Sequence, residues 1–403
     1  MCEELVITGI SILNSMGSTP PEVWLNLCQN KDTFDFIKNY NPLEYPSISD
    51  ITKAFEYNLT DKIILESKNK FISNNFFGKN TLSAIYLANE AIKNSGIDVK
   101  NNKNGAIFFS TITTESIERI LRIKHLISND RKYDARYIMS AEQDFVGGLL
   151  SGMYDLIGPN MTLTYACASS IMSIDYATKM ILAGDIDYAI IGACDINSNP
   201  ISIHKYKMLG ALSYDRCVPL DNNRTGMAVG DGGGFIILEK KSNAKNRGAR
   251  IYATIKGIGF GTDKYHPTSP SKTGDGIFKV IDMALKKSNL TYKDIPYINA
   301  HATGTYIGDK IEYMVLNELF PNSLVNAFKG YIGHLTAASG ISELIMSILS
   351  MNNSLIIKSA RVIDPMTDKL KICTENTILD IKYCLKTSFG FGGKCSAIIL
   401  ERE

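Results

Sequence analysis

A single cysteine stands in a run of small residues where the chain changes from a strand pattern to a helix pattern. Residues 161–165 form a short apolar run that predicts a strand, and the apolar periodicity of residues 171–183 predicts a long helix. The turn between them places Cys167 near a helix N-terminus, where unpaired N–H groups and the helix dipole favour a thiolate. Cys167 is therefore a candidate nucleophile, and a buried structural cysteine is the alternative.

Strands and helices alternate along most of the chain. Apolar runs predict strands at residues 5–10, 105–109 (as a central strand), 188–192, 251–259 and 297–300, and two more within residues 384–400. Apolar periodicity predicts helices from about residue 21, and at residues 81–95, 117–127, 145–156, 276–287, 311–320 and 340–350. This alternation predicts layers of helix and sheet. The second half repeats the rhythm of the first, which indicates two related units.

The composition argues against several classes of protein. A net charge of +2 over 403 residues predicts neither nucleic-acid binding nor attachment to a membrane surface. No apolar segment reaches the ~18–20 residues that a membrane span needs. Glu3 and Glu4 precede the first apolar run, which argues against a signal peptide. The eight cysteines form no CxxC pair, so we expect reduced thiols and a cytoplasmic protein.

Two of the five histidines occupy turns of small residues. His301 follows a short apolar strand, and His334 follows Gly333 just before an apolar helix. A lone histidine is most often a hydrogen-bonded structural residue, but two such turns in one half of the chain favour a function. A metal pair is the rival interpretation, although the chain has neither an HExxH motif nor a nearby third ligand. We therefore predict no metal site.

The ordered motifs of the chain resemble those of the β-ketoacyl-ACP synthases. The main ones are Ala166-Cys167-Ala168-Ser169-Ser170, His301 with Gly308-Asp309 and Glu312, Lys329 with Gly333-His334 and Gly340, and Ser388-Phe389-Gly390-Phe391-Gly392-Gly393. Supporting matches lie at residues 6–9, 158–160, 219–226 and 263–270. The chain looks like an elongating-type condensing enzyme over almost its whole length.

The resemblance implies a thiolase-like α/β fold. Such a fold has two related βαβ-rich halves that form a layered α/β/α/β/α core. In this sequence the halves would be residues 1–245, with the nucleophilic cysteine, and residues 246–403, with the catalytic pair of histidines.

The resemblance also implies a Cys-His-His enzyme. Cys167 would take an acyl chain from a carrier-protein thioester, and the N–H groups of Cys167 and Phe391 would form an oxyanion hole. His301 and His334 would bind the carbonyl of a malonyl thioester and stabilise the enolate released by decarboxylation. The enolate would then attack the acyl group on the cysteine and give a β-ketoacyl product. Lys329 would lie beside the two histidines.

Other motif residues would support this centre. Glu343 would pair with the lysine. Asp309 and Glu312 would order the loop of the first histidine, or serve only as carboxylates at a helix N-terminus. Phe391 would also act as a gate between two substrate pockets, or pack as a core aromatic residue. The residues expected to contact the pantetheine arm are Thr303, Thr305 and Thr268.

The sequence departs from the family pattern at several places near the motifs. Tyr165 stands where a threonine is usual, Ala302 replaces a glycine, and Lys394-Cys395 replaces Thr-Asn. Residues 327–328 and 110–114 also differ from the usual small or glycine-rich segments. A change of one methylene in a pocket shifts substrate preference by about 1–3 kcal/mol. These departures favour a specialised polyketide or polyene ketosynthase over a housekeeping fatty-acid enzyme.

The resemblance also implies the partners. They are an acyl carrier protein that delivers acyl and malonyl groups, and a second subunit, which makes a homodimer or a heterodimer with a chain-length-factor-like homologue. No metal or organic cofactor is implied, because pantetheine arrives on the carrier. A basic patch for the acidic carrier would draw on Lys62, Lys68, Lys70, Lys205 and Lys207, or these are scattered solvated lysines.

Two other identities are weighed against the condensing enzyme. A chain-length factor has the same fold without a working nucleophile, and Cys167 argues against it. The resemblance to thiolases that act on acetoacetyl-CoA would imply a Cys-His-Cys site. The second histidine, His334, argues against a thiolase.

Overall fold

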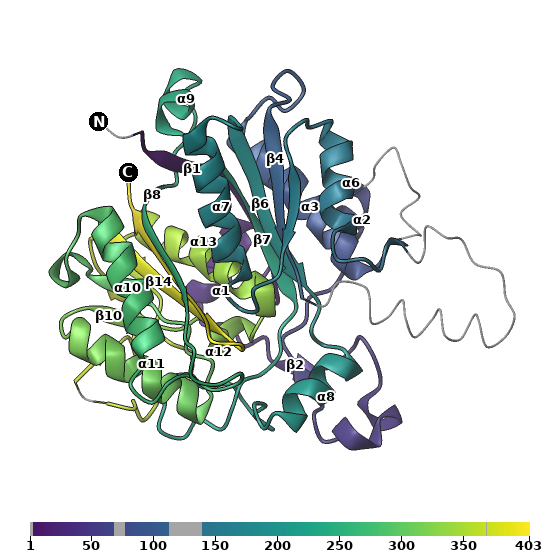
Figure 1. Cartoon of the computed structure of the whole chain (residues 1–403). Coiled ribbons are helices and arrows are strands. Elements are labelled where there is room, and N and C mark those ends of the chain that lie inside the picture. Colours follow the sequence, from purple (N-terminus) through teal and green to yellow (C-terminus); the bar gives the residue numbers. More distant parts are fainter. Residues whose placement is uncertain (1–2, 68–76, 113–138, 368) are drawn as a thin grey trace, which may run out of the picture.

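The structure, a computed structural model, describes residues 3–67, 77–112, 139–367 and 369–403 (Figure 1). Within these ranges one 11-stranded sheet runs through the molecule, in the order β12-β10-β9-β14-β15-β8-β1-β7-β6-β4-β5. The predicted helix at residues 117–127 lies outside the described residues, as do Lys68, Lys70, Thr113 and Thr114. No helix of the described ranges is both long and apolar enough to span a membrane.

The N-terminal half of the sheet has a mixed pattern of strand directions. Its strands are β1 (Leu5–Leu13), β4 (Gly105–Ser110), β5 (Asn160–Leu163), β6 (Tyr188–Asp195) and β7 (Gly232–Lys240). β7 pairs antiparallel with β1 on one side and with β6 on the other, whereas β6, β4 and β5 run parallel. β4 pairs with β6 on one side and with β5 on the other, and all of its residues are buried, which confirms the prediction of a central strand there. β4 is apolar on both faces because helices pack against both faces of the sheet at this strand.

The C-terminal half repeats this pattern strand for strand. Its strands are β8 (Ala253–Thr262), β9 (Tyr297–Asn299), β10 (Leu324–Asn326), β14 (Tyr383–Gly390) and β15 (Lys394–Glu401), with the short β12 (Lys371–Ile372) at the edge. β15 pairs antiparallel with β8 and β14, whereas β14, β9 and β10 run parallel. Within the described sheet, three residue pairs of β1 and β8 join the two halves. The repeated topology shows two related units, as the thiolase-like fold requires.

Alternate residues of each strand face different helices. The helices are α3 (Lys79–Ser95), α6 (Phe145–Tyr154), α7 (Ser169–Ala183), α10 (Asp275–Ser288), α11 (Tyr306–Leu319) and α13 (Ser339–Asn352). On β4, Phe108 packs in the core of α7 and α13, whereas Ile107 packs in the core of α3. On β15, Ile398 belongs to the α13 core and Ile399 to the core of α10 and α11. This period of two produces the predicted α/β/α/β/α layers.

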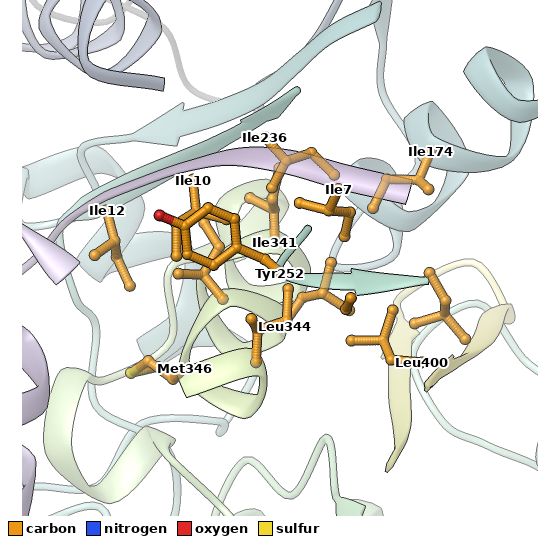
Figure 2. Packing of buried hydrophobic residues seen from close by; sticks show 14 of the residues in the cluster. Ile7, Ile10, Ile12, Ile174, Ile236, Tyr252, Ile341, Leu344, Met346 and Leu400 are labelled. Carbon is orange, nitrogen blue, oxygen red and sulfur yellow. The ribbon is translucent and has the colours of Figure 1, made fainter. Parts of the chain in front are cut away.

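α7 and α13 form the central layer between the two halves. Figure 2 shows Ile341 and Leu344 of α13 among side chains from both halves, including Ile7 of β1 and Leu400 of β15. These side chains are buried, with exposed fractions of at most 3%. Fully burying each such aliphatic group contributes about 1.5–3 kcal/mol. The N-terminal ends of α7 and α13 are therefore held firmly, and both active-site turns precede them.

Several helix boundaries follow from local sequence signals. α3 and α7 end at Gly96 and Gly184, whose φ angles of 65° and 84° are left-handed and suit glycine. α1 (Pro20–Cys28) begins after Thr19, whose side chain accepts the N–H of Glu22. The remaining helices are α2 (Asp61–Glu66), α8 (Pro200–Met208), α9 (Lys241–Asn246) and α12 (Lys329–Ile332), with short strands β2 (Asp35–Phe36), β3 (Lys53–Ala54), β11 (Leu355–Ile356) and β13 (Thr377–Ile378), and 3-10 turns at residues 42–44, 46–48, 292–294 and 336–338.

Candidate active site

A strained turn presents the Cys167 thiol at the beginning of α7. Ala166 has a φ of 48°, a left-handed conformation that costs an alanine about 1–2 kcal/mol. Ser169 holds the turn closed, since its Oγ accepts the N–H of Tyr165 at 2.6 Å and donates to the Ala166 carbonyl at 2.6 Å. Cys167 is thereby fixed two residues before the first residue of the helix.

The end of β14 lies against this turn. A Cβ added at Gly390 would stand 2.7 Å from the Ala166 Cβ and 2.9 Å from the Cys167 nitrogen. Only glycine allows so close an approach. The contact brings Phe389 and Phe391, on either side of this glycine, to the nucleophile. The ring of Phe389 meets that of His301 edge to face, with 5.8 Å between centroids.

His334 is in contact with the cysteine. Its Nε2 lies 3.1 Å from the Sγ of Cys167. Its Nδ1 receives the Thr336 N–H at 3.2 Å and faces the Ser339 Oγ at 2.8 Å. Because Nδ1 accepts the Thr336 N–H it carries no proton, so the Ser339 hydroxyl, whose oxygen accepts the Leu335 N–H, donates to Nδ1. Nδ1 is thus an acceptor, the proton of the neutral ring is on Nε2, and this N–H is directed at the sulfur.

His301 has the same tautomer for a different reason. The Lys329 Nζ lies 3.3 Å from its Nδ1 and donates to the His301 carbonyl at 2.5 Å. An ammonium group can only donate, so Nδ1 accepts and the neutral ring carries its proton on Nε2. The His301 and His334 rings lie 5.5 Å apart, edge to face. Two N–H donors therefore stand at one place beside the sulfur.

Two buried carboxylates of α11 hold the loop of His301. Glu312 accepts the N–H groups of His301 and Ala302 at 2.8 and 2.7 Å. Asp309 accepts the N–H groups of Leu220 and Gly304 at 2.9 and 3.0 Å. Burial raises the pKa of Asp309 to about 6. The hydrogen bonds from Glu312 and Asp309 to backbone N–H groups hold the His301 loop in place, in agreement with the expected ordering role.

Burial dominates the ionisation of the three central residues. It raises the pKa of Cys167 to about 11, although the Lys329 cation acts in the opposite direction. The thiolate that the helix N-terminus favours is thus not the resting state. Burial, followed by the charge of Lys329, lowers the pKa of His301 and His334 well below 6.5. Both imidazoles are neutral donors at physiological pH.

Because the two histidines stay neutral in the folded chain, stability should fall as the pH drops below 6.5. Above that value neither the folded nor the unfolded chain binds a proton at these rings, and below it only the unfolded chain does. Each ring then removes up to about 1.4 kcal/mol of unfolding free energy per pH unit. In urea unfolding between pH 7.5 and 5, the unfolding free energy of His334→Gln should fall less per pH unit than that of the wild type. An equal fall for the two proteins would contradict the assignment of a neutral His334.

A cavity of about 670 Å³ opens onto these groups. Cys167, His301 and His334 line it, together with Phe391, which is 38% exposed. The three residues expected at a pantetheine arm, Thr268, Thr303 and Thr305, line it as well. Lys329 and Glu343 lie behind the histidines, fully buried and paired at 2.5 Å. The structure thus brings all the predicted site residues to one place.

Three further residues at or beside the cavity stand out in the sequence only as a candidate basic-patch lysine, Lys205, and as departures from the family pattern, Tyr165 and Lys394. Lys205 of α8 lines it on the same wall as Tyr206. Two family departures touch each other there, because the Lys394 Nζ lies 5.0 Å from the centre of the Tyr165 ring. The Tyr165 hydroxyl faces the Thr262 Oγ1 at 3.0 Å on β8. Only the departure from the family pattern at Tyr165 and Lys394 could have drawn attention to this pair.

The candidate basic patch is dispersed in the described residues. Lys205 faces the cavity, whereas Lys207 is paired with Asp50 at 2.5 Å. Lys62 of α2 lies over the ring of Tyr86. Of these three lysines, Lys205 alone lines the cavity, and the ion pair of Lys207 is not the solvated side chain of the alternative.

The three central side chains also have the composition of a metal site. The Cys167 sulfur and one nitrogen of each histidine lie within 4.8 Å of one another. A metal would have to replace the proton on both Nε2 atoms. That proton would then need to move to Nδ1, which already accepts hydrogen bonds from Lys329 in one ring and from Thr336 in the other. The hydrogen bonds around the rings therefore oppose metal coordination.

The sequence matches known proteins over nearly its whole length. The family described as Beta-ketoacyl synthase, N-terminal domain, matches residues 2–244, and the Beta-ketoacyl synthase, C-terminal domain, matches residues 252–362. The chain is 30% identical to the chloroplastic 3-oxoacyl-[acyl-carrier-protein] synthase II of Arabidopsis thaliana, over 98% of this chain and 75% of that protein. It is 28% identical to 3-oxoacyl-[acyl-carrier-protein] synthase 2 of Staphylococcus aureus strain N315, over 99% and 98%.

Solved structures show the same fold. The ishigamide ketosynthase/chain length factor superposes with a TM-score of 0.92 at 22% identity, over the whole of both chains. A beta-ketoacyl synthase from Burkholderia phymatum gives a TM-score of 0.88 at 22% identity, again over both whole chains. With the family matches and the Cys-His-His site described above, these likenesses lead to one conclusion: the chain belongs to the β-ketoacyl synthase family and is an acyltransferase of the condensing type.

Proposed function

We propose that the chain extends an acyl group carried on an acyl carrier protein, using malonyl-ACP as the second substrate. The observation that carries this proposal is the meeting of the Cys167 sulfur with two Nε2–H donors at one end of a deep cavity. A nucleophile beside two neutral donors suits thioester chemistry, in which charge develops on a carbonyl oxygen.

The first step transfers the acyl group to Cys167. Its sulfur attacks the thioester carbonyl, the bond to the carrier sulfur breaks, and the thiol proton leaves with the carrier thiol. Because burial raises the pKa of Cys167 to about 11, the thiol is protonated at rest. The Nε2–H of His334, 3.1 Å away, stabilises the thiolate as it forms. The N–H groups of Cys167 and Phe391 would hold the developing oxyanion.

The second step is decarboxylation and carbon–carbon bond formation. His301 and His334 donate to the carbonyl oxygen of the malonyl thioester. The bond to the malonyl carboxylate breaks, CO₂ leaves, and its electron pair forms an enolate that the two donors stabilise. The enolate carbon attacks the acyl group, the bond to sulfur breaks, and the Cys167 thiolate takes up a proton. Neutral donors suit this step, since no base is needed.

We further propose a polyketide or polyene substrate. The departures from the family pattern support it, because Tyr165 and Lys394 meet beside the cavity and Lys394 lines it. A known structure titled as a type II PKS acyl-carrier protein in complex with its ketosynthase shares the fold, with a TM-score of 0.85. The retained nucleophile and the two histidines argue against a chain-length factor and against a thiolase.

The proposed assembly is a dimer in the cytoplasm without a metal or organic cofactor. Among the described residues, β5 is at the edge of the sheet, a position that suits pairing with a second subunit. Exposed apolar side chains flank it, including Ile157 at 77% and Leu182 at 45%. The partner subunit is a second copy or a chain-length-factor-like homologue. None of the seven cysteines in the described ranges forms a disulfide, which supports a reducing compartment.

Intact-mass spectrometry with a panel of acyl-ACPs tests the function. We expect the protein to gain the mass of one acyl group from the preferred carrier, and to lose it as β-ketoacyl-ACP when malonyl-ACP is added. Light scattering on the same sample should give twice the 44.5 kDa of one chain, alone or after a homologous partner is added. A failure of every acyl-ACP to load the protein, with and without that partner, would refute the proposal.

A further inference from the structure

A second buried lysine stands behind the two histidines. Lys386 of β14 has an exposed fraction of 0%, and its Nζ lies 2.6 Å from the Oε2 of Glu343. The other carboxylate oxygen of Glu343, Oε1, lies 2.5 Å from the Nζ of Lys329. One carboxylate therefore bridges two ammonium groups. Lys386 also donates to the Thr387 carbonyl at 2.6 Å, on the strand that leads to Phe389.

The charges of this cluster cancel. Lys329 and Lys386 contribute two positive charges, and Glu343 and Glu312 contribute two negative charges. All four side chains have exposed fractions of at most 2%, and they come from α12, β14, α13 and α11. An unbalanced buried charge is costly, so the four side chains form one electrostatic unit. Replacing Lys386 with an apolar residue would leave this unit with a net charge of −1.

A net negative charge behind the histidines would favour imidazolium. Lys386 acts on both rings, and each is also close to Lys329. The other titratable and charged groups that face the rings are Cys167, Lys205, Asp309, Glu312 and Glu343. Within the cluster of four side chains, Lys329 offsets one of the two carboxylates and Lys386 offsets the other.

We propose that Lys386 is a positioning residue that keeps His301 and His334 as neutral Nε2–H donors by balancing the Lys329–Glu343–Glu312 cluster. This inference rests on the proposed function. Lys386 touches no substrate, because two other layers of side chain separate it from the cavity: Glu343 with Lys329, and then the histidines. Its effect is therefore expected in the pH dependence of the decarboxylation step.

The test is the pH profile of malonyl-ACP decarboxylation, as kcat/KM, for three variants. For Lys386→Met we expect the acid limb to move up by about one pH unit, so that the rate at any pH on that limb falls about tenfold while the rate at pH 8 stays within about threefold of wild type. Glu343→Gln adds a net positive charge and should move the limb down. The double variant should return the limb to the wild-type position. These opposite signs separate an electrostatic role from a packing role.

A titration of the histidine rings needs no substrate. NMR of ¹⁵N-histidine-labelled protein should show His301 and His334 titrating at higher pH in Lys386→Met than in the wild type. Losses that are equal at every pH, or ring titrations that do not move, would overturn the proposal. If Lys386→Met does not fold, Lys386→Arg, which retains the charge, and Glu343→Gln still give opposite expectations. A wild-type protein that lacks all decarboxylation would refute the proposed function, and the NMR shifts would still decide the role of Lys386.

Discussion

Replacing Cys167 with alanine is expected to abolish acyl transfer to the protein. The sulfur is the one nucleophile that lies beside the two histidine donors in the described cavity. Loss of a covalent nucleophile reduces turnover on the order of 10⁴- to 10⁶-fold in comparable enzymes. Intact-mass spectrometry after incubation with the preferred acyl-ACP should therefore show no adduct, while the wild type is fully loaded. β-Ketoacyl-ACP formation should vanish with the adduct.

The same variant should still decarboxylate malonyl-ACP. His301 and its partner Lys329 do not depend on the sulfur for their position. The matched control is Cys217→Ala, because Cys217 is also buried and its Sγ bonds to the Thr303 carbonyl at 3.3 Å without lining the cavity. It should load and condense like the wild type. An adduct on Cys167→Ala, or loss of loading in Cys217→Ala alone, would move the nucleophile to another cysteine.

Local patterns predict most of the architecture because each element has its own signal. The strand, turn and helix around Cys167 lie where the apolar runs and small residues place them. α11 is less well predicted: it begins at Tyr306 and not at residue 311. Its apolar periodicity starts only in the second turn, because Gly308 and Asp309 occupy the first. α12, four residues long, has no periodicity that a sequence could show.

The composition of the site is predicted from motifs, but its electrostatics are not. Lysine is a solvent-exposed residue in most proteins, so Lys386 between Leu385 and Thr387 of a strand gives no indication of a buried ion pair. Its partner Glu343 lies on another element, and only the fold brings the two together. The protonation state of Cys167 is likewise determined by the fold and not by its local sequence. The helix N-terminus favours a thiolate, and burial, which only the folded chain determines, opposes it and prevails.

Replacing either histidine with alanine should block condensation while leaving a protein that can still be loaded. Each ring supplies one Nε2–H to the same oxyanion, and the loss of one such donor costs about 10²- to 10³-fold in rate. His301→Ala should retain acylation within a few-fold of wild type, because its ring contacts Phe389 and Lys329 and not the sulfur. His334→Ala should also slow acylation, because its Nε2 lies 3.1 Å from Sγ. Single-turnover loading and CO₂ release, measured separately, resolve the two effects.

The exposed His204→Ala is the matched control for this experiment, and it should change neither rate. The informative result is the asymmetry between the two active-site variants. If His301→Ala and His334→Ala slow acylation equally, the reactivity of the sulfur depends on both rings, and the contact of the His334 Nε2 with the sulfur has no special role. If neither slows CO₂ release, the enolate is stabilised elsewhere, and the N–H groups of Cys167 and Phe391 become the remaining donors at this end of the described cavity.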